Sequence, residues 1–250
     1  MPLKFLKSSI RKAFQIFGYD CIKTKFPPGK RMGIDPFTDM AYFLEGNQTP
    51  VICDVGANEG QTVDKFKKLF PASIIHSFEP SKETFQCLKS NIKKFDSVTA
   101  WNFGLGAEAQ TLQFNENTLS SMSSFLPSTP ETWGLVKQVN SVEVQTLDQF
   151  AANNKLPCID VLKIDTQGYE YEVLKGSINL LKDRKIKLVY LEVTMGFMYQ
   201  HLPPLSLILS LLERNNFSVV AFYDQHHEYP KGTLHWCDIL FVNEEAAIKL

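Results

Sequence analysis

The stretch Val51-Ile-Cys-Asp-Val-Gly-Ala-Asn-Glu-Gly60, followed by Ile74-Ile-His-Ser-Phe-Glu-Pro80, decides the fold of this chain. The first part is a short apolar run that ends in a turn with two glycines. The second part, after a gap long enough for a helix, is another apolar run that ends in Glu79. This order predicts a strand, a turn, a helix and a second strand, the unit with which an α/β fold builds a nucleoside pocket.

The turn and the end of the second strand carry the groups that such a pocket requires. Gly56 and Gly60 let the backbone turn sharply and approach a ligand without an intervening Cβ atom. The helix after the turn presents unpaired N–H groups. Glu79 lies 19 positions after Gly60, close to the ~20 expected between such a turn and an acid that accepts hydrogen bonds from ribose hydroxyls.

The turn differs from the one that binds dinucleotides. From Asp54 to Gly60 it reads Asp-x-Gly-x-Asn-x-Gly, whereas a dinucleotide turn reads G-x-G-x-x-G. A dinucleotide would bring the negative charge of its pyrophosphate to Asp54. An acid there suits a cationic ligand end instead, such as the amino group or the sulfonium of S-adenosylmethionine. The turn therefore favours methyl transfer over hydride transfer.

Composition and charge favour a single enzyme domain. Of the 250 residues, 44% are hydrophobic, enough to bury a substantial core. The formal net charge of −1 gives no electrostatic footprint for nucleic acid. The five cysteines are scattered without a C-x-x-C pair, which indicates free thiols in a reducing cytosol. No apolar run approaches the ~18 residues of a membrane span, and the start of the chain lacks a signal peptide pattern, so we expect a cytoplasmic protein.

The first 46 residues differ from the rest of the chain. Apolar residues from Leu3 to Phe17 recur at helical spacing, with lysine and arginine on the other side. The pattern predicts a helix packed on the core; the alternative is a basic helix that rests on a membrane surface or a partner. We expect an N-terminal helical extension over residues 1–46 and an S-adenosylmethionine-dependent methyltransferase domain over residues 47–250.

Strands and helices alternate from residue 50 onward. Helical spacing is seen from Phe85 to Phe95, from Val173 to Leu181 and from Leu205 to Leu212. Alternation of this kind predicts an α/β, Rossmann-like, seven-stranded and mostly parallel sheet with helices on both faces. The last two runs are joined without room for a long helix, which matches the Rossmann-like methyltransferase sheet, whose final strand is antiparallel. The seven strand-like runs are 51–55, 74–78, 98–103, 161–164, 188–193, 219–223 and 239–242.

One segment, about residues 107–146, interrupts the alternation. Strand-like runs at 111–114 and 141–147 enclose a long polar stretch that contains Ser120-Ser-Met-Ser-Ser124 and ends at Trp133. Such a stretch in a compact domain is a functional lid or an ordinary surface excursion. Trp133 is a candidate to close over a substrate.

The candidate site residues lie at the carboxyl ends of the strands, where doubly wound sheets bind ligands. The candidate catalytic groups are Asp165, Glu192 and His226. Two acids of the 159–170 motif also have a purely structural explanation. Asp165 would cap the next helix, and Glu170 would pair with Lys175. The candidate cofactor-binding residues are Asp54, Gly56, Ala57, Asn58, Gly60, Glu79, Asn102, Gly104 and Asp165.

The histidines near the end of the chain do not form a zinc pattern. His226 and His227 are adjacent, so on a strand their side chains point to opposite faces, and no carboxylate follows at ligand spacing. We expect no resident metal, although Asp165 and Glu192 are oxygen ligands that could hold Mg²⁺. His226 is a candidate general base beside a substrate hydroxyl.

The chain resembles the FkbM family of S-adenosylmethionine-dependent methyltransferases. Four motifs carry the resemblance in order, and it extends over residues 50–243. The resemblance implies O-methylation of a hydroxyl on a sugar, glycan or secondary metabolite such as a polyketide. The motifs are Asp54-Val-Gly-Ala-Asn-Glu-Gly60, Phe78-Glu-Pro80, Val144-Gln-Thr-Leu-Asp148 and Ile159-Asp-Val-Leu-Lys-Ile-Asp-Thr-Gln-Gly-Tyr-Glu170 with Val173-Leu-Lys-Gly176.

Each candidate residue then has an expected role. Asp54 would lie near the cofactor's ammonium, and Glu79 would bind its ribose hydroxyls. Asn102 and Gly104 would line the adenine, and Asp165, with Glu192 or His226, would face the acceptor. The protein would act mainly through proximity and orientation, worth ~7–11 kcal/mol.

Three alternative functions can be compared with the sequence. A nicotinamide-dependent Rossmann oxidoreductase should have a third glycine at G-x-x-G spacing and no acid at position 54. The sequence meets neither condition. A non-catalytic nucleoside-binding module would keep the pocket without turnover, which the polar groups at Asp165 and Glu192 argue against. A nucleic-acid methyltransferase is disfavoured by the net charge.

Overall fold

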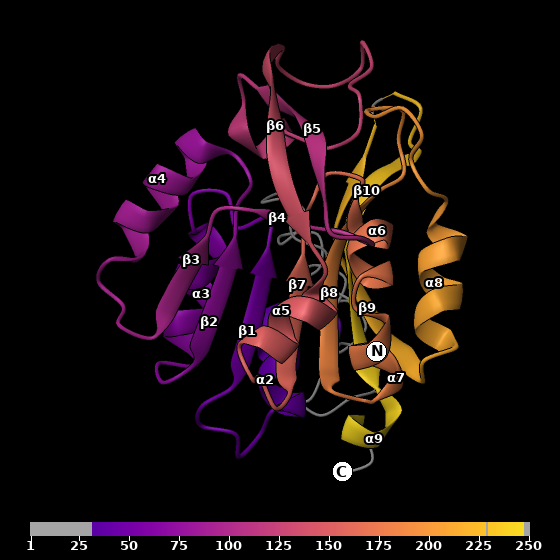
Figure 1. The fold of residues 1–250 in the computed structure, drawn as a ribbon. Helices are drawn as coiled ribbons and strands as arrows, with labels where there is room; N and C mark the ends of the chain where they lie inside the picture. Colours follow the sequence, from indigo (N-terminus) through magenta and orange to yellow (C-terminus); the bar gives the residue numbers. More distant parts are fainter. Residues whose placement is uncertain (1–31, 229, 248–250) are drawn as a thin grey trace, which may run out of the picture. The chain divides into compact units, whose positions relative to one another are not determined.

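Seven strands form the central sheet, in the order β3-β2-β1-β7-β8-β10-β9 (Figure 1). The structure is a computed structural model that describes residues 32–228 and 230–247. Neighbouring strands are parallel except at β10, which is antiparallel to both β8 and β9. The predicted sheet is therefore confirmed, including its antiparallel last strand. The strands are β1 (Val51–Val55), β2 (Ile74–Phe78), β3 (Val98–Trp101), β7 (Ile159–Ile164), β8 (Ile186–Thr194), β9 (Phe217–His227) and β10 (Leu234–Asn243).

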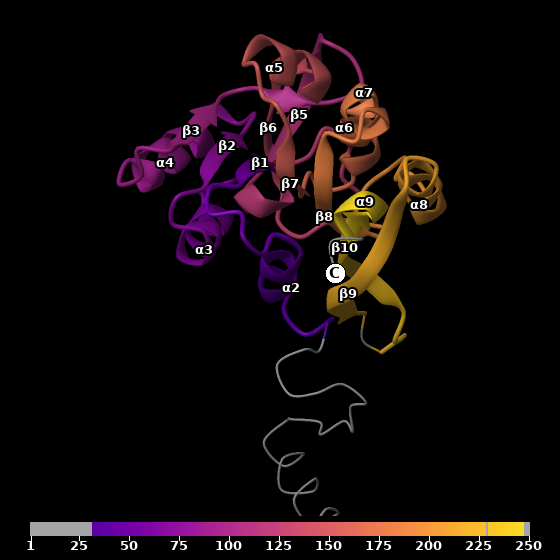
Figure 2. The same ribbon diagram turned by 90° about the horizontal axis from the view of Figure 1, so that it is seen from below.

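Helices cover both faces of this sheet (Figure 2). One buried cluster joins the sheet to α2 (Pro36–Phe43), α3 (Gln61–Leu69) and α4 (Lys82–Ile92). The other joins it to α5 (Leu147–Asn153), α6 (Glu170–Lys175), α7 (Ile178–Lys182) and α8 (Leu205–Glu213). A short helix, α9 (Glu244–Ala247), follows the last strand. Side-chain oxygens of Ser81 and Thr146 cap α4 and α5, as is usual for helix starts.

The sequence pattern from Val173 to Leu181 predicts one helix, but the structure contains two. Helix α6 ends at Gly176, whose carbonyl oxygen accepts a hydrogen bond of 3.0 Å from the Asp148 backbone N–H. A Cβ atom on Gly176 would lie 1.9 Å from the Gly106 carbonyl oxygen. The chain therefore passes too close to its neighbour here for a continuous helix with side chains, and glycine marks the break.

The interrupting segment forms a second sheet of three strands in the order β4-β6-β5. These are β4 (Gly104–Leu105), β5 (Gln110–Asn117) and β6 (Val136–Gln145), with a 3₁₀ turn, η1 (Ser120–Met122), between β5 and β6. The run predicted as one strand over residues 98–103 ends at Trp101, because the next residues leave the main sheet to pair with β6. The small sheet lies above the carboxyl ends of the parallel strands (Figure 1).

The helical pattern from Leu3 to Phe17 lies outside the described residues, so both interpretations of it stay predictions. Helix α2, which precedes the predicted domain start at residue 47, packs its buried Met40 into the cluster shared with α3 and α4. Within the described part of the chain, no helix has the length and apolar character needed to cross a membrane.

Phe150 of α5 is the centre of the core on one face of the sheet. It is 1% exposed and makes edge contacts with Phe78 and Trp101, with ring centroids 4.8 and 5.1 Å apart. Phe78 ends the strand that leads directly to Glu79, so this packing fixes the position of the strand end.

We expect Phe150→Ala to lower the free energy of unfolding by about 3–5 kcal/mol, because it removes buried apolar contacts and leaves a cavity. Urea denaturation measures the change. Phe222→Ala is the matched control, since Phe222 is 42% exposed on β9, and it should change stability by about 0.5 kcal/mol or less. Equal losses in the two variants would contradict this assignment of the core.

Candidate active site

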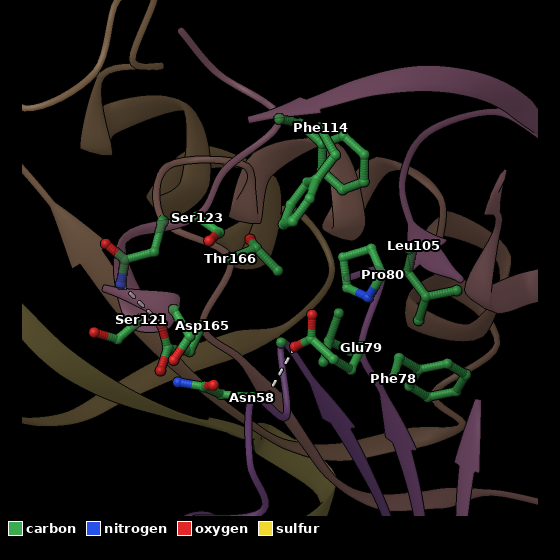
Figure 3. Close-up of a pocket in the computed structure, with 16 residues that line it drawn as sticks. Asn58, Phe78, Glu79, Pro80, Leu105, Phe114, Ser121, Ser123, Asp165 and Thr166 are labelled. Atoms are coloured by element: carbon green, nitrogen blue, oxygen red, sulfur yellow. Dashed lines mark hydrogen bonds between the residues drawn. The ribbon is translucent and has the colours of Figure 1, made fainter. Parts of the chain in front are cut away.

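A pocket opens where the carboxyl ends of β1, β2 and β7 meet the small sheet (Figure 3). Apolar side chains, among them Phe78, Leu105 and Phe114, gather at one end of it, and Asn58 and Asp165 lie at the other. The pocket thus has an apolar end and a polar end. Its lining is Val55, Gly56, Asn58, Phe78, Glu79, Pro80, Gly104, Leu105, Phe114, Ser120, Ser121, Ser123, Phe125, Asp165, Thr166 and Gln167.

Glu79 lies between the two ends and is fixed by backbone groups. Its Oε2 accepts a hydrogen bond of 3.0 Å from the Asn58 N–H, and its Oε1 accepts one of 2.9 Å from the Ser81 N–H. Burial raises the pKa of Glu79 to about 7, against the lowering effect of these two bonds. Asn102 does not line this pocket; its amide donates to the carbonyl oxygens of Glu79 and Pro80 and so fixes the loop after β2.

The turn after β1 approaches the end of β7 closely. Gly56 has φ +73°, and a Cβ atom on it would lie 1.8 Å from the Asp165 carbonyl oxygen. The backbone N–H groups of Gly56 and of the buried Ala57 both donate to the Phe78 carbonyl oxygen. Gly60, at φ +93°, begins α3. This turn can therefore pass between two strand ends only with glycine at position 56.

Asn58 offers the pocket a free acceptor. Its backbone is left-handed, with φ 47°, a conformation that asparagine adopts more readily than most residues. Its Oδ1 is buried and has no hydrogen-bond partner among residues 32–228 and 230–247. A buried amide oxygen without a partner is costly, so a ligand that donates to Asn58 would be favoured.

Asp54 lies under the turn and pairs with a buried lysine. Asp54 is fully buried and Lys163 is 5% exposed, with 3.1 Å between Lys163 Nζ and Asp54 Oδ1. Lys163 also donates to the Gly56 carbonyl oxygen at 3.1 Å and lies 3.5 Å from Asp165 Oδ2. Burial lowers the pKa of Lys163, but the carboxylates of Asp54 and Asp165 outweigh burial and raise it. Lys163 is therefore held as a cation that joins β1, the turn and the end of β7.

Asp165 is joined to Glu192 through a glutamine. Gln167 Nε2 donates to Asp165 Oδ1 at 3.1 Å and to Glu192 Oε1 at 2.7 Å. The side chain of Asp165 is 34% exposed and lines the pocket. Burial, with the nearby charges of Asp165 and Asp238, raises the pKa of Glu192. The protonated form of Glu192 is thus favoured near neutral pH.

Glu170 shapes the loop that carries Asp165. One buried carboxylate oxygen, Oε1, accepts from the Thr166 N–H, the Thr166 hydroxyl and the Gly168 N–H, each at 3.0 Å. Lys175, the alternative partner of Glu170, pairs with Glu172 instead. Tyr169 is the N-cap residue of α6, and no side chain there accepts a capping hydrogen bond. Asp165 therefore does not cap this helix.

The structure places His226 apart from these groups. Its ring stacks on Trp236, with centroids 3.8 Å apart, and it is not among the residues that line the pocket. In the described part of the chain, no cluster of three or more His, Cys, Asp or Glu side chains is arranged to hold a metal ion.

Several site residues were not found from the sequence. Lys163 lies in a buried strand, and a lysine at such a position is a sequence signal of a buried charge. Gln167 has a left-handed φ of 54°, which the sequence does not show. Phe114, Ser121 and Phe125 come from the small sheet and its long loop. The serine-rich composition of that loop is the only signal of it in the sequence. The path of the loop back over the pocket depends on contacts between distant parts of the chain.

Known methyltransferases resemble this chain. The family profile described as "Methyltransferase FkbM domain" matches residues 54–219. The 2-O-methyltransferase NoeI of Sinorhizobium fredii is 26% identical over 194 residues, 73% of this chain and 76% of that protein. The hexuronic acid methyltransferase AglP of Haloferax volcanii is 25% identical over 61% of this chain, which spans 59% of AglP. Among solved structures, the fibrillarin pre-rRNA processing protein of Methanococcus jannaschii aligns with a TM-score of 0.48 at 13% identity, over 89% of this chain and 81% of that one.

We expect Lys163→Met to lower the free energy of unfolding by about 3–5 kcal/mol, because it leaves the carboxylate of Asp54 buried without a partner. Adding Asp54→Asn should restore part of that loss, since no unpaired charge then remains. Denaturant unfolding of the two single variants and the double variant measures the coupling.

The matched control is Lys175→Met, which removes an ion pair in which the lysine side chain is 40% exposed, and it should cost about 1 kcal/mol or less. If Lys163→Met costs no more than this control, the ion pair does not stabilise the site.

Proposed function

The chain belongs to the FkbM methyltransferase family, and from this premise we propose that it transfers a methyl group from S-adenosylmethionine to a hydroxyl group of a sugar or glycan. The observation that carries the proposal is the position of Glu79. Its buried carboxylate lies between the apolar end of the pocket and the free acceptor of Asn58. NoeI and AglP, by their names, methylate a 2-hydroxyl and a hexuronic acid, which supports a sugar as acceptor.

The lining of the pocket fits the parts of S-adenosylmethionine. Phe78, Leu105 and Phe114 would enclose the adenine, and Glu79 would accept hydrogen bonds from the ribose hydroxyls. Asn58 Oδ1 would accept from the ammonium of the methionine part. Asp54 would act indirectly, because it is fully buried and its charge is matched by Lys163. When bound, the cofactor supplies a methyl group already activated on a sulfonium.

Asp165 is the proposed general base for the acceptor hydroxyl. Lys163 and Gln167 restrain its carboxylate from two sides, which fixes its direction in the pocket. It would hold the hydroxyl by a hydrogen bond and take up its proton as the oxygen forms its new bond to the methyl carbon and the bond from that carbon to sulfur breaks, leaving a neutral thioether. Glu192 would keep Gln167 in place as a positioning residue.

Titration calorimetry of the full chain with S-adenosylmethionine, NAD⁺ and NADP⁺ tests the proposal. Saturable binding of S-adenosylmethionine alone, followed by methyl transfer to a sugar hydroxyl, is the expected result. Binding of a nicotinamide cofactor in its place would favour the oxidoreductase alternative. Binding of S-adenosylmethionine without transfer to any hydroxylated acceptor would favour the binding-module alternative.

We expect cofactor affinity to fall as the pH drops through about 7, because the pKa of Glu79 is raised to about 7. Ribose hydroxyls donate to the ionised carboxylate, so bound ligand favours the ionised form and protonation weakens binding. Well below the pKa, the dissociation constant should rise about tenfold per pH unit. Calorimetric titration of S-adenosylhomocysteine between pH 5.5 and 8.5 is the measurement.

Glu79→Gln provides the control, since its side chain has nearly the same size and does not titrate in this range. It should bind more weakly than the parent at pH 8 and lose the dependence on pH. A dependence that persists in Glu79→Gln would assign it to another group, such as Glu170, whose pKa burial also raises to about 7.

We expect Asp165→Asn to lower kcat by about 10²–10⁴-fold, the usual contribution of a general base. Asparagine keeps the size of the side chain and its hydrogen bond from Gln167, so the loss should appear in kcat more than in affinity for the cofactor. Asp183→Asn is the control, because the Asp183 side chain is 60% exposed. An unchanged kcat in Asp165→Asn would remove Asp165 from the mechanism.

A further inference from the structure

Aromatic side chains line a second hollow, at the same edge of the sheet as the pocket. Trp133 comes from the long loop of the small sheet, Phe197 from the loop after β8 and His226 from the end of β9. Trp236, at the start of β10, stacks against His226. We call Trp133, Phe197, His226 and Trp236 the aromatic corner.

The strand register places the aromatic corner next to the acids of the active site. Trp236 pairs with Thr194 on β8, and Asp238, two residues further along β10, pairs with Glu192. Residues two apart on a strand point to the same face, and two residues span about 7 Å. Trp236 therefore lies about 7 Å further along the sheet than Glu192, on the same face.

Trp133 lies nearly perpendicular to a stacked pair of rings, His226 and Trp236. His226 and Trp236 are stacked with an interplanar angle of 10°. Trp133 is perpendicular to both, at 85° to Trp236 and 87° to His226, with centroids 5.4 and 6.1 Å away. Trp133 remains 48% exposed and Phe197 76% exposed. Two large aromatic side chains thus present apolar surface to solvent beside an active-site edge, which marks a binding surface.

Hydrogen bonds fix the backbone segments that carry these exposed rings. The Asn117 amide donates to the Trp133 carbonyl oxygen at 2.9 Å. The Thr129 N–H donates to the Met198 carbonyl oxygen at 3.0 Å, and the buried Thr132 hydroxyl donates to the same oxygen. The backbones that carry Trp133 and Phe197 are thereby joined to each other. Backbone segments that are fixed before binding lose little entropy when a ligand packs on their side chains.

The polar rim of the hollow indicates what kind of ligand it accepts. Glu131, Glu228 and Lys231 complete its lining with His235. Lys231 Nζ lies 3.1 Å from Glu228 Oε1, so that pair is neutral and Glu131 adds a negative charge. Carboxylates accept hydrogen bonds from sugar hydroxyls, whereas an anionic sugar would be repelled.

We propose that the aromatic corner binds a neutral pyranose ring of the acceptor, next to the sugar that is methylated. The apolar C–H face of such a ring packs on Trp133 and Phe197, and its hydroxyls donate to the carboxylates of the rim. The inference rests on the proposed sugar O-methylation and names where a longer acceptor is held.

Saturation-transfer NMR on the full chain with S-adenosylhomocysteine tests the inference, with maltotriose, cellotriose and chitotriose as neutral probes. Ring protons of at least one probe should show saturation transfer. Its dissociation constant should rise about five- to tenfold in Trp133→Ala, the loss expected for one aromatic contact, and return close to the parent value in Trp133→Phe. Phe222→Ala, which removes an exposed aromatic ring outside the corner, should bind as the parent does.

The outcomes separate this inference from the proposed function. If S-adenosylhomocysteine binds but none of the three probes does, or if a probe binds Trp133→Ala as it binds the parent, the aromatic corner is not a sugar site and the methyl transfer proposal still stands. Tighter binding of digalacturonate than of the neutral probes also overturns it. Absence of S-adenosylmethionine binding overturns the proposed function and with it the role of the corner in acceptor binding.

Discussion

The site depends on one buried cation. The ammonium of Lys163 lies within 3.5 Å of Asp54, of the Gly56 carbonyl oxygen and of Asp165, so a single group connects two strand ends and the turn between them. Removing an ammonium from water is costly unless opposite charges surround it. Here two carboxylates do so, and the geometry that satisfies the lysine also places Asp165 at the pocket. The stability of the sheet edge and the direction of the proposed base therefore have the same origin.

Two parts of the chain contribute to the two sides of the proposed site. Local motifs at β1 and β2 form the cofactor side, where Glu79 and Asn58 are linked by a backbone hydrogen bond of 3.0 Å. The small sheet adds Phe114 to the same proposed cofactor pocket, and its long loop contributes Trp133 to the aromatic corner, which is the proposed acceptor side. A fixed cofactor side and a separate acceptor side allow one fold to serve different acceptors, because function is carried by the site and not by the fold.

The sequence predicts the parts of this structure that depend on local patterns. The seven strands, the turn at Gly56 and the position of Glu79 follow from apolar runs, glycine and spacing over about 30 residues, all of which a single sequence displays. The sequence does not predict the role of Lys163, because two of its three partners, Asp54 and Gly56, lie more than 100 positions away. The roles expected for Asp54 and Asn102 assumed that a polar group at a strand end faces the ligand, but one is fully buried and the other binds backbone carbonyls. The face to which a strand-end side chain points is set by tertiary packing.

The loop after β8 links the aromatic corner to the active-site pocket through hydrogen bonds. Phe197 of the aromatic corner and Tyr199 belong to the same short segment, and the Tyr199 hydroxyl donates to Gln167 Oε1 at 3.0 Å. Gln167 in turn donates to Asp165. A sugar ring packed on Phe197, as proposed, would restrain the segment from which the Tyr199 hydroxyl bonds to Gln167, and through Gln167 the proposed base. Binding energy from a sugar that does not react is thereby available to position the groups that do, which is how remote contacts come to affect turnover as well as affinity.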